Sequence, residues 1–276
     1  MTVLRLLCVC VLGWTVFSWA NLQLRDYPRV DSDDLLRVRL PRLVQLAYST
    51  GDPWLAANLN VFRSIVADGH TREKENYRVQ GQLQMDAAFF NPLHEDNYYL
   101  AAAMLPWNGQ VEAGQDVLLR ASNARQWDMW PAFYYAFNAM YFERDMAKAG
   151  QWAEIAATRN PRNAPALRAM ASAWYERGDD PRVAMEILEK MFEDSRDENF
   201  RALVSARYRR LQGLLALREA VADYRSRHGG TPRQIEQLIG YGALQALPDD
   251  PLGAGYVLDA GGQVQLADHM TKQKQQ

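Results

Sequence analysis

The chain has 276 residues, of which 48% are hydrophobic and 23% charged, and its formal net charge is -2 at pH 7. This is the composition of an ordinary globular protein with one large core or two smaller ones. The near-neutral charge gives no support for nucleic-acid binding, which usually shows as a basic stripe. The two cysteines, Cys8 and Cys10, both lie in the first apolar stretch, which excludes a disulfide framework and a zinc site built on thiolates.

Residues 1–24 are predicted to be a signal anchor or a signal peptide. Arg5 is followed by an uncharged, mostly apolar run over residues 6–20, and counting on to Leu24 reaches the lower end of the length that a transmembrane helix needs, about 17–25 residues. The pattern favours a single-pass anchor in a bacterial inner membrane. The alternatives are cleavage near Ala20, which would release the chain into the periplasm, and a buried helix. With either an anchor or a cleaved signal, the rest of the chain faces the periplasm.

Residues 25–200 are predicted to form a helical domain. From about residue 35 to residue 225, apolar residues recur at spacings of three and four, and glycine or proline stands mainly between such runs. Helical segments of this kind begin at Trp54, Tyr98 and Phe133. No run alternates with period two, so the domain is expected to be all-α.

Between about residues 80 and 200 the helices come in pairs that are punctuated by small residues, and an Asn-Pro step ends two of the pairs, at Pro92 and Pro161. The clearest pair contains Trp174 and a turn glycine, Gly178. This region resembles degenerate tetratricopeptide repeats, in spite of Asp145 at the position of another turn glycine. The resemblance implies a solenoid of antiparallel helix pairs whose concave face binds peptides or partner domains. A generic array of α-hairpins is the alternative.

An aromatic cluster in the middle of this array is the candidate partner-binding site. Its aromatic density exceeds what packing requires, which favours an aromatic-lined groove, with a bulky seam between repeats as the alternative. The resemblance also suggests a clamp that binds the carboxylate of a peptide. The nearest candidates for it are Asn97, Asn138 and Arg168, although the flanking lysines of the family are missing. The candidate partner-binding residues are Trp127, Trp130, Tyr134, Tyr135, Asn138 and Tyr141.

Residues 201–268 are predicted to form a long helix and a small α+β unit, and residues 269–276 a disordered tail. The long helix should end at Gly229, because glycine supplies a left-handed cap. A short helix should follow, with Thr231 as its cap, Pro232 at its first position and Gln234 completing a capping box. Alternating residues around the turn at 259–262 then predict a terminal β-hairpin, with Tyr256 and Leu258 on one strand and Val264 and Leu266 on the other.

Residues 224–266 resemble part of the globular domain of the major pseudopilins of type II secretion. The shared order is a tyrosine and glycine that end a helix, a Thr-Pro start, a short helix, the motif LP-x-DP-x-G-x-x-Y and a β-turn. The resemblance implies local conformation and, weakly, an envelope-associated context. In the motif, Asp249 is expected to bond nearby backbone amides rather than to ligate calcium with Asp250 and Asp259.

No residue set predicts catalysis. The histidines His70, His94, His228 and His269 are scattered, and the chain has neither a phosphate-binding loop nor a nucleophile elbow. We therefore expect no enzyme, no cofactor and no metal, but a membrane-anchored, periplasm-facing scaffold that binds a protein partner in pilus, secretion or envelope-polymer assembly. The alternative function is a glycan-binding or hydrolytic envelope protein that uses the aromatic groove.

Overall fold

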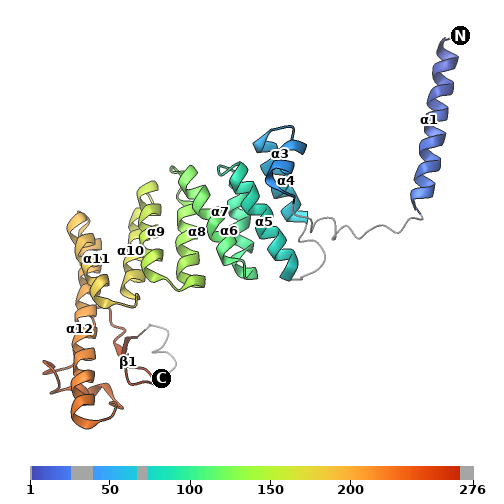
Figure 1. Ribbon diagram of the computed structural model, residues 1–276. Coiled ribbons are helices and arrows are strands. Elements are labelled where there is room, and N and C mark those ends of the chain that lie inside the picture. The colour runs from blue at the N-terminus through green and yellow to red at the C-terminus, as the bar shows by residue number, and fades with distance from the viewer. Residues whose placement is uncertain (1, 26–39, 67–73, 268–276) are drawn as a thin grey trace.

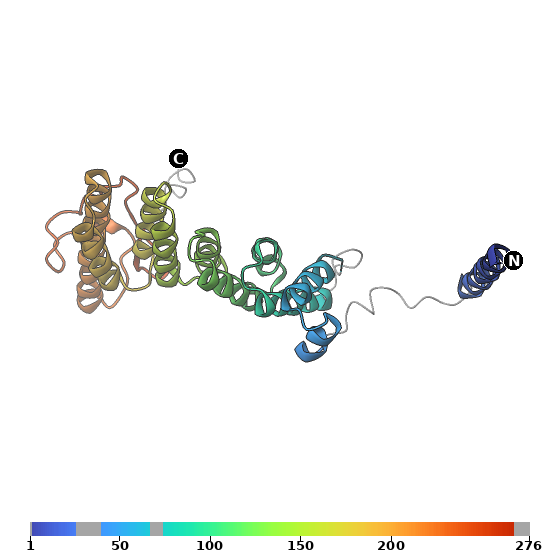
Figure 2. The ribbon, with the colours of Figure 1, turned by 90° about the horizontal axis from the view of Figure 1, so that it is seen from above.

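The computed structural model describes residues 2–25, 40–66 and 74–267. Its helices α3 to α11 pack side by side in one row, α12 closes one end of the row, and α1 stands apart (Figure 1). The same row is seen from above in Figure 2, from α3 and α4 at one end to α12 at the other. The helices are α1 (Thr2–Arg25), α3 (Arg42–Tyr48), α4 (Pro53–Val66), α5 (Lys74–Phe90), α6 (Glu95–Met104), η1 (Pro106–Asn108), α7 (Val111–Ala124), α8 (Trp130–Asn138), the π-helical turn η2 (Ala139–Glu143), α9 (Met146–Arg159), α10 (Ala164–Glu176), α11 (Pro181–Asp194), α12 (Glu198–His228) and η3 (Ile235–Leu238).

The chain is mostly helical, with packed helix pairs and a two-stranded antiparallel sheet, as the sequence predicts. The sheet pairs β1 (Tyr256–Leu258) with β2 (Val264–Leu266), and Tyr256 lies opposite Leu266. This confirms the predicted hairpin. The predicted tail at residues 269–276 lies outside the described residues.

The prediction of a membrane anchor was wrong. Across residues 2–25, 40–66 and 74–267, no helix combines the length and the apolar character that crossing a bilayer requires. The physical reason lies at the edges of the apolar run in α1. Arg5 precedes it, and Asn21, Gln23 and Arg25 follow it, so the mostly apolar stretch, residues 6–20, falls short of about 20 residues. The inner-membrane localisation and the membrane contact inferred from this run are corrected with it.

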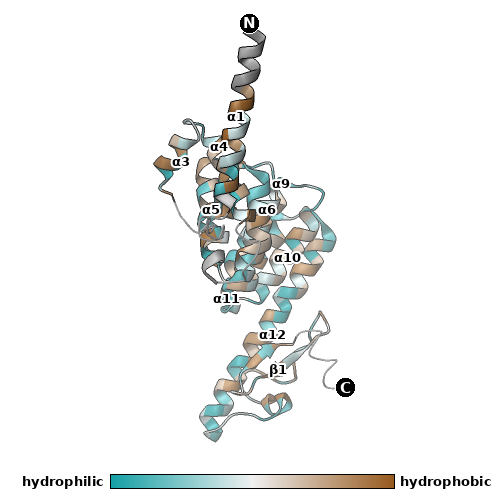
Figure 3. Ribbon diagram, turned by 90° about the vertical axis from the view of Figure 1, so that its right-hand side faces the viewer, coloured by the Kyte–Doolittle hydropathy of each residue, from teal (hydrophilic) through white to brown (hydrophobic). Residues whose placement is uncertain are grey.

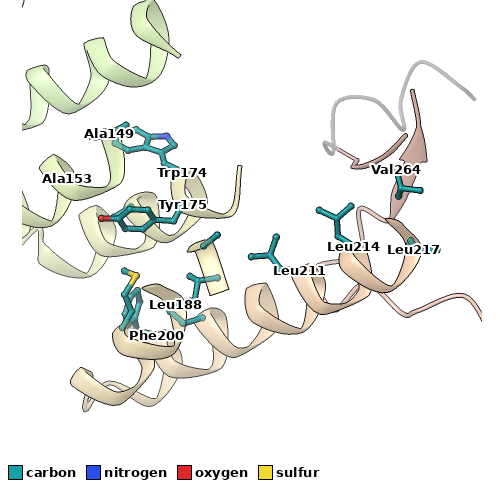
Figure 4. Close-up of a cluster of buried hydrophobic side chains, with 14 of the residues drawn as sticks. Ala149, Ala153, Trp174, Tyr175, Leu188, Phe200, Leu211, Leu214, Leu217 and Val264 are labelled. Carbon is teal, nitrogen blue, oxygen red and sulfur yellow. The ribbon is translucent and has the colours of Figure 1, made fainter. Parts of the chain in front are cut away.

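Small residues let the central helices approach one another closely. Ala136, Ala153 and Ala171, on α8, α9 and α10, have no exposed surface and belong to one core cluster. Gly150 of α9 lies directly under the ring of Tyr175 from α10, since a Cβ at position 150 would be 2.6 Å from two ring carbons. Figure 4 shows Trp174 and Tyr175 projecting from α10 on the side of α9. A helix pair that is flat on one face can bury its neighbour's large side chains there.

The turn before α9 corrects one detail of the sequence analysis. Asp145 does not take the place of a turn glycine. Its carboxylate instead caps α9, accepting the backbone N–H of Lys148 at 2.9 Å. The left-handed conformation falls on the preceding residue, Arg144, which has φ 61°. Positive φ is uncommon for a residue with a side chain and costs strain energy, so the turn is built without the glycine that normally relieves it.

The long C-terminal helix agrees with its prediction. Asp197 caps the start of α12 through the backbone N–H groups of Asn199 and Phe200, and Gly229 ends the helix with φ 67°. The part of α12 that extends beyond the other helices carries the C-terminal unit, and hydrophilic and hydrophobic residues are mixed along it (Figure 3). Leu211, Leu214 and Leu217 line one side of α12, and Val264 of β2 lies nearby (Figure 4).

The predicted short helix is only a single 3-10 turn, η3, and it does not begin at Thr231. Thr231 lies against the hairpin instead, since a Cβ on Gly262 would be 2.6 Å from the Cβ of Thr231. The side-chain oxygen of Gln237 accepts the backbone N–H groups of Arg233 and Gln234, so the cap forms later in the chain than predicted. Packing on the hairpin therefore overrides the local start signal.

Arg210 of α12 joins the helical row to the C-terminal unit. Its guanidinium lies 3.5 Å from the carboxylate of Glu176 on α10 and donates to Asp250 at 3.1 Å and to the carbonyl of Ala267 at 2.7 Å. Arg207 also donates to Glu176. All of these charged groups are largely buried: Arg210 is 7% exposed, and burial raises the pKa of Glu176 in spite of the two neighbouring arginines.

Replacing Gly150 by alanine should destabilise the protein. Glycine to alanine within a helix normally stabilises by about 1 kcal/mol, but here the new methyl group meets the Tyr175 ring, and overpacking costs about 1–3 kcal/mol. Urea unfolding of Gly150→Ala should show a lower free energy of unfolding. The matched control is Gly230→Ala, whose Cβ has open space around it. A Gly150→Ala variant more stable than the wild type would contradict this packing.

Removing the guanidinium of Arg210 should cost far more than removing that of its neighbour. Arg210→Met leaves the carboxylates of Glu176 and Asp250 buried without their shared cation, which typically costs about 3–5 kcal/mol. Arg209→Met, at an exposed position, should change the free energy of unfolding by less than about 0.5 kcal/mol. Chemical denaturation measures the free energy of unfolding of both variants. Equal losses would refute the role of Arg210 in connecting the helical row to the C-terminal unit.

Candidate functional site

An apolar groove of about 570 Å³ runs between α6 and α8, with η1 at its side. Its size lies within the range of ordinary ligand pockets, about 300–1,000 Å³. We call it the aromatic groove because five of its residues carry aromatic rings. The aromatic groove is lined by Tyr99, Leu100, Ala102, Ala103, Trp107, Phe133, Tyr134, Phe137 and Asn138.

Helix geometry places the aromatic residues of α8 on two different sides. Successive residues in a helix are rotated by about 100°, so the neighbours Tyr134 and Tyr135 can point to different sides of α8. Tyr134 points into the aromatic groove, where its ring meets that of Tyr99 at a centroid distance of 5.9 Å. Tyr135 is only 8% exposed and packs inside the row against Trp152, at 4.5 Å. Burial raises the pKa of Tyr134 above its ordinary value, so its hydroxyl stays neutral.

One end of the aromatic groove is built from stacked rings. Phe137 and Tyr141, one turn apart, lie nearly parallel with their centroids 5.7 Å apart. Trp107 contacts Tyr141 at 5.3 Å and Phe142 at 5.0 Å, yet remains 56% exposed. An indole that is fixed by neighbouring rings and still accessible offers a large contact area at low entropic cost.

Asn138 is the one polar residue of the groove other than the tyrosines and Trp107. It is 2% exposed, and its side-chain nitrogen Nδ2 has no hydrogen-bond partner in the described part of the chain. A buried amide donor without a partner costs about 1–3 kcal/mol. Since this nitrogen has almost no solvent-accessible surface, an acceptor carried by a bound molecule satisfies it only when the Asn138 side chain turns towards the groove.

The structure brings together only part of the predicted site. Tyr134 and Asn138 line the groove, while Trp130 stacks on Tyr134 at 5.6 Å, and Tyr141 stacks at the other end. Tyr135 does not line the groove, because it lies in the core. Trp127 is also outside the groove: it is 66% exposed and contacts the guanidinium of Arg125.

The sequence does not reveal the contribution of α6 and of the turn after it. Tyr99, Leu100 and Trp107 line the groove, and they lie in or just after a predicted helical segment with no sequence signal that joins it to the site. Phe133 and Phe137 were visible from their spacing of four residues, which puts them on one helix face with Tyr134 beside them. The spacing could not predict which residues of α6 lie opposite those of α8.

The residues suggested for a carboxylate clamp lie in three different places. Asn97 donates to the carbonyl of Gln84 at 3.0 Å, Asn138 lines the aromatic groove, and Arg168 lines a separate cavity with Glu154 and Asp194. The lining of the aromatic groove contains no lysine or arginine. The geometry therefore does not form that clamp.

The acidic residues of the C-terminal motif stabilise turns. Asp250 accepts the backbone N–H groups of Leu252 and Gly255, whereas Asp249, the residue predicted to do so, is exposed. Asp259 accepts from Gly261 and Gln263 at 2.9 Å, and these backbone bonds help to lower its pKa. In the described residues, no three His, Cys, Asp or Glu side chains are grouped so as to hold a metal ion.

Two of the histidines have structural partners. The ring of His94 accepts the backbone N–H of Asn97 and so caps α6, and His228 lies 2.6 Å from the hydroxyl of Tyr241. His70 and His269 lie outside the described residues. Neither His94 nor His228 lines the aromatic groove.

Comparison of the chain with family models gives no match, and comparisons with curated proteins and with solved structures give none either. The function must therefore be inferred from the chemistry of the groove itself.

Proposed function

We propose that this chain is a helical-repeat scaffold whose aromatic groove binds an uncharged, apolar segment of a protein partner. The single observation that carries the proposal is the buried, unpartnered amide of Asn138 within an otherwise apolar, aromatic-lined groove. A polypeptide supplies both an apolar surface for the rings and a hydrogen-bond acceptor for the amide. Its apolar side chains cover the rings, and a backbone carbonyl accepts from Nδ2 of Asn138.

The order of the helix pairs supports this proposal. The pairs α4–α5, α6–α7, α8–α9 and α10–α11 follow one another along the row, and the groove lies between the first helices of two successive pairs. Buried alanines and Gly150 occupy the contacts between the helices, as the small positions of such repeats do. Arg144, which takes the left-handed turn position, is the clearest departure.

The residues that line the groove also favour an uncharged partner segment over a charged one. With neither lysine nor arginine in the groove, a free peptide carboxylate would meet no compensating charge there. With no carboxylate in it either, a cationic side chain gains nothing. The C-terminal unit, with its pseudopilin-like motif, supports pilus or secretion machinery as the place to look for the partner.

Binding to the groove should depend on Trp107 and not on Trp127. The probes are octapeptides of leucine, phenylalanine, alanine and serine that are blocked at both ends, titrated into the full chain with isothermal calorimetry. Trp107→Ala should weaken binding about 30-fold, because anchor tryptophans in interfaces contribute about 2 kcal/mol or more. Trp127→Ala, which removes an exposed indole outside the groove, is the matched control.

Two results would count against this function. The first is an equal loss for the Trp107 and Trp127 variants, which would indicate nonspecific apolar binding. The second is tight binding of chito-oligosaccharides in the groove together with no binding of any peptide. That outcome would favour the glycan-binding alternative.

A further inference from the structure

The row of helices ends at α4, beside the short helix α3, and the residues of α4 are distributed there in an unusual way (Figure 1). The side of α4 that faces the protein carries small or polar residues, among them Asn60 and Ser64, which are fully buried. A surface helix normally has the reverse distribution, with its apolar stripe facing the core. We call the outer side of α4 the end face. Its apolar residues, all exposed or half-exposed, are Leu55, Leu59, Phe62, Ile65 and Val66.

Hydrogen bonds hold the inner side of α4 in place. The side-chain amide of Asn60 donates to Gln45 of α3 at 2.6 Å, and Gln45 donates in turn to the buried carboxylate of Asp86 on α5 at 2.8 Å. The side chain of Gln80 on α5 donates to the carbonyl of Ser64 at 3.1 Å. Turning the apolar side of α4 inward would break these bonds and leave buried polar groups unpaired, which is costly. The large apolar side chains are therefore fixed outward.

Four residues of the end face are spaced symmetrically. Leu55, Leu59, Phe62 and Val66 follow one another at intervals of four, three and four residues, which is the spacing of the seam between paired helices. These intervals read the same in both directions along the helix. An antiparallel copy of α4 therefore presents the same pattern to the end face, as an interface with two-fold symmetry requires.

The charge of α4 also favours its own copy over other partners. Arg63 is the only charged residue of the helix, so two copies bring neither repulsion nor a buried carboxylate to the seam. Helices that lie on a membrane surface combine an apolar side with a polar side rich in lysine and arginine. In α4 the side opposite the end face is uncharged and buried in the protein instead.

We propose that the end face pairs with the end face of a second copy of this chain, with the two α4 helices antiparallel. In this arrangement Leu55 of each copy lies opposite Val66 of the other, and Leu59 lies opposite Phe62. Five large apolar side chains of α4 are 40–65% exposed. At about 200 Å² for a large side chain, each copy offers on the order of 500 Å², and the pair reaches the roughly 1,000 Å² at which specific interfaces begin. The proposal is separate from the aromatic groove, whose lining residues belong to other helices.

Sedimentation equilibrium of the full chain tests the pairing, and a dilution series should show a reversible monomer–dimer equilibrium. Phe62→Glu should weaken the dimer at least about 30-fold, because it places a carboxylate in the centre of the apolar seam. Phe62 is 65% exposed, so the helix content measured by circular dichroism should not change. The matched control is Val183→Glu, at an exposed apolar position on α11, which should leave the dimer intact.

A mixing experiment tests the antiparallel register. Phe62→Glu and Leu59→Lys should each be monomeric alone, and an equimolar mixture should form a dimer again, because the two changed residues face each other only in this register. The proposal fails if the mixture stays monomeric, or if the wild type is monomeric throughout and binds phosphatidylcholine vesicles or nothing. It also fails if Trp19→Glu, on α1, abolishes association while Phe62→Glu does not, since α1 would then form the contact.

Discussion

Close contact between helices across small side chains is the constraint on which the rest of the structure depends. A helix pair of this kind cannot bury its apolar face alone, so each pair needs the next one. Ala136, Ala153 and Ala171 leave the flat surfaces on which this stacking rests, and Gly150 accommodates a whole tyrosine ring. At the end of the row, a different kind of interaction holds the elements together. There Arg210 connects α10 to the C-terminal unit through buried charges rather than through small residues.

The aromatic groove follows from this stacking. Because the small residues face inward, the large rings of α8 that do not fit the core face outward and meet those of α6, which forms the aromatic groove. The unpartnered amide of Asn138 in this groove is a cost that a folded chain offsets elsewhere or that a ligand removes.

The sequence predicted the secondary-structure elements better than the contacts between their side chains. Periodicity located the helices, and turn chemistry located the end of α12 at Gly229 and the pairing of Tyr256 with Leu266. Periodicity could not separate Tyr134 from Tyr135, since that requires knowing which face of α8 meets α9. Nor could it show that Trp107 would contact Tyr141 of η2, which lies two helices later in the chain. The capping signal at Thr231 failed for a similar reason, because contact with the hairpin decided that segment. The anchor prediction relied on a run of apolar residues that is bounded too closely by polar ones.

The central claim is that the aromatic groove recognises a polypeptide backbone through Asn138, and the affinity of Asn138→Leu for the blocked apolar octapeptides tests it most directly. Leucine has the same number and branching of side-chain heavy atoms, so the change removes the amide while it keeps the shape of the side chain. If a bound carbonyl accepts from Nδ2, affinity should fall about three- to tenfold, the value of one buried hydrogen bond. If the groove binds through apolar contact alone, removing an unpartnered amide should leave affinity unchanged or increase it, and the account would be contradicted.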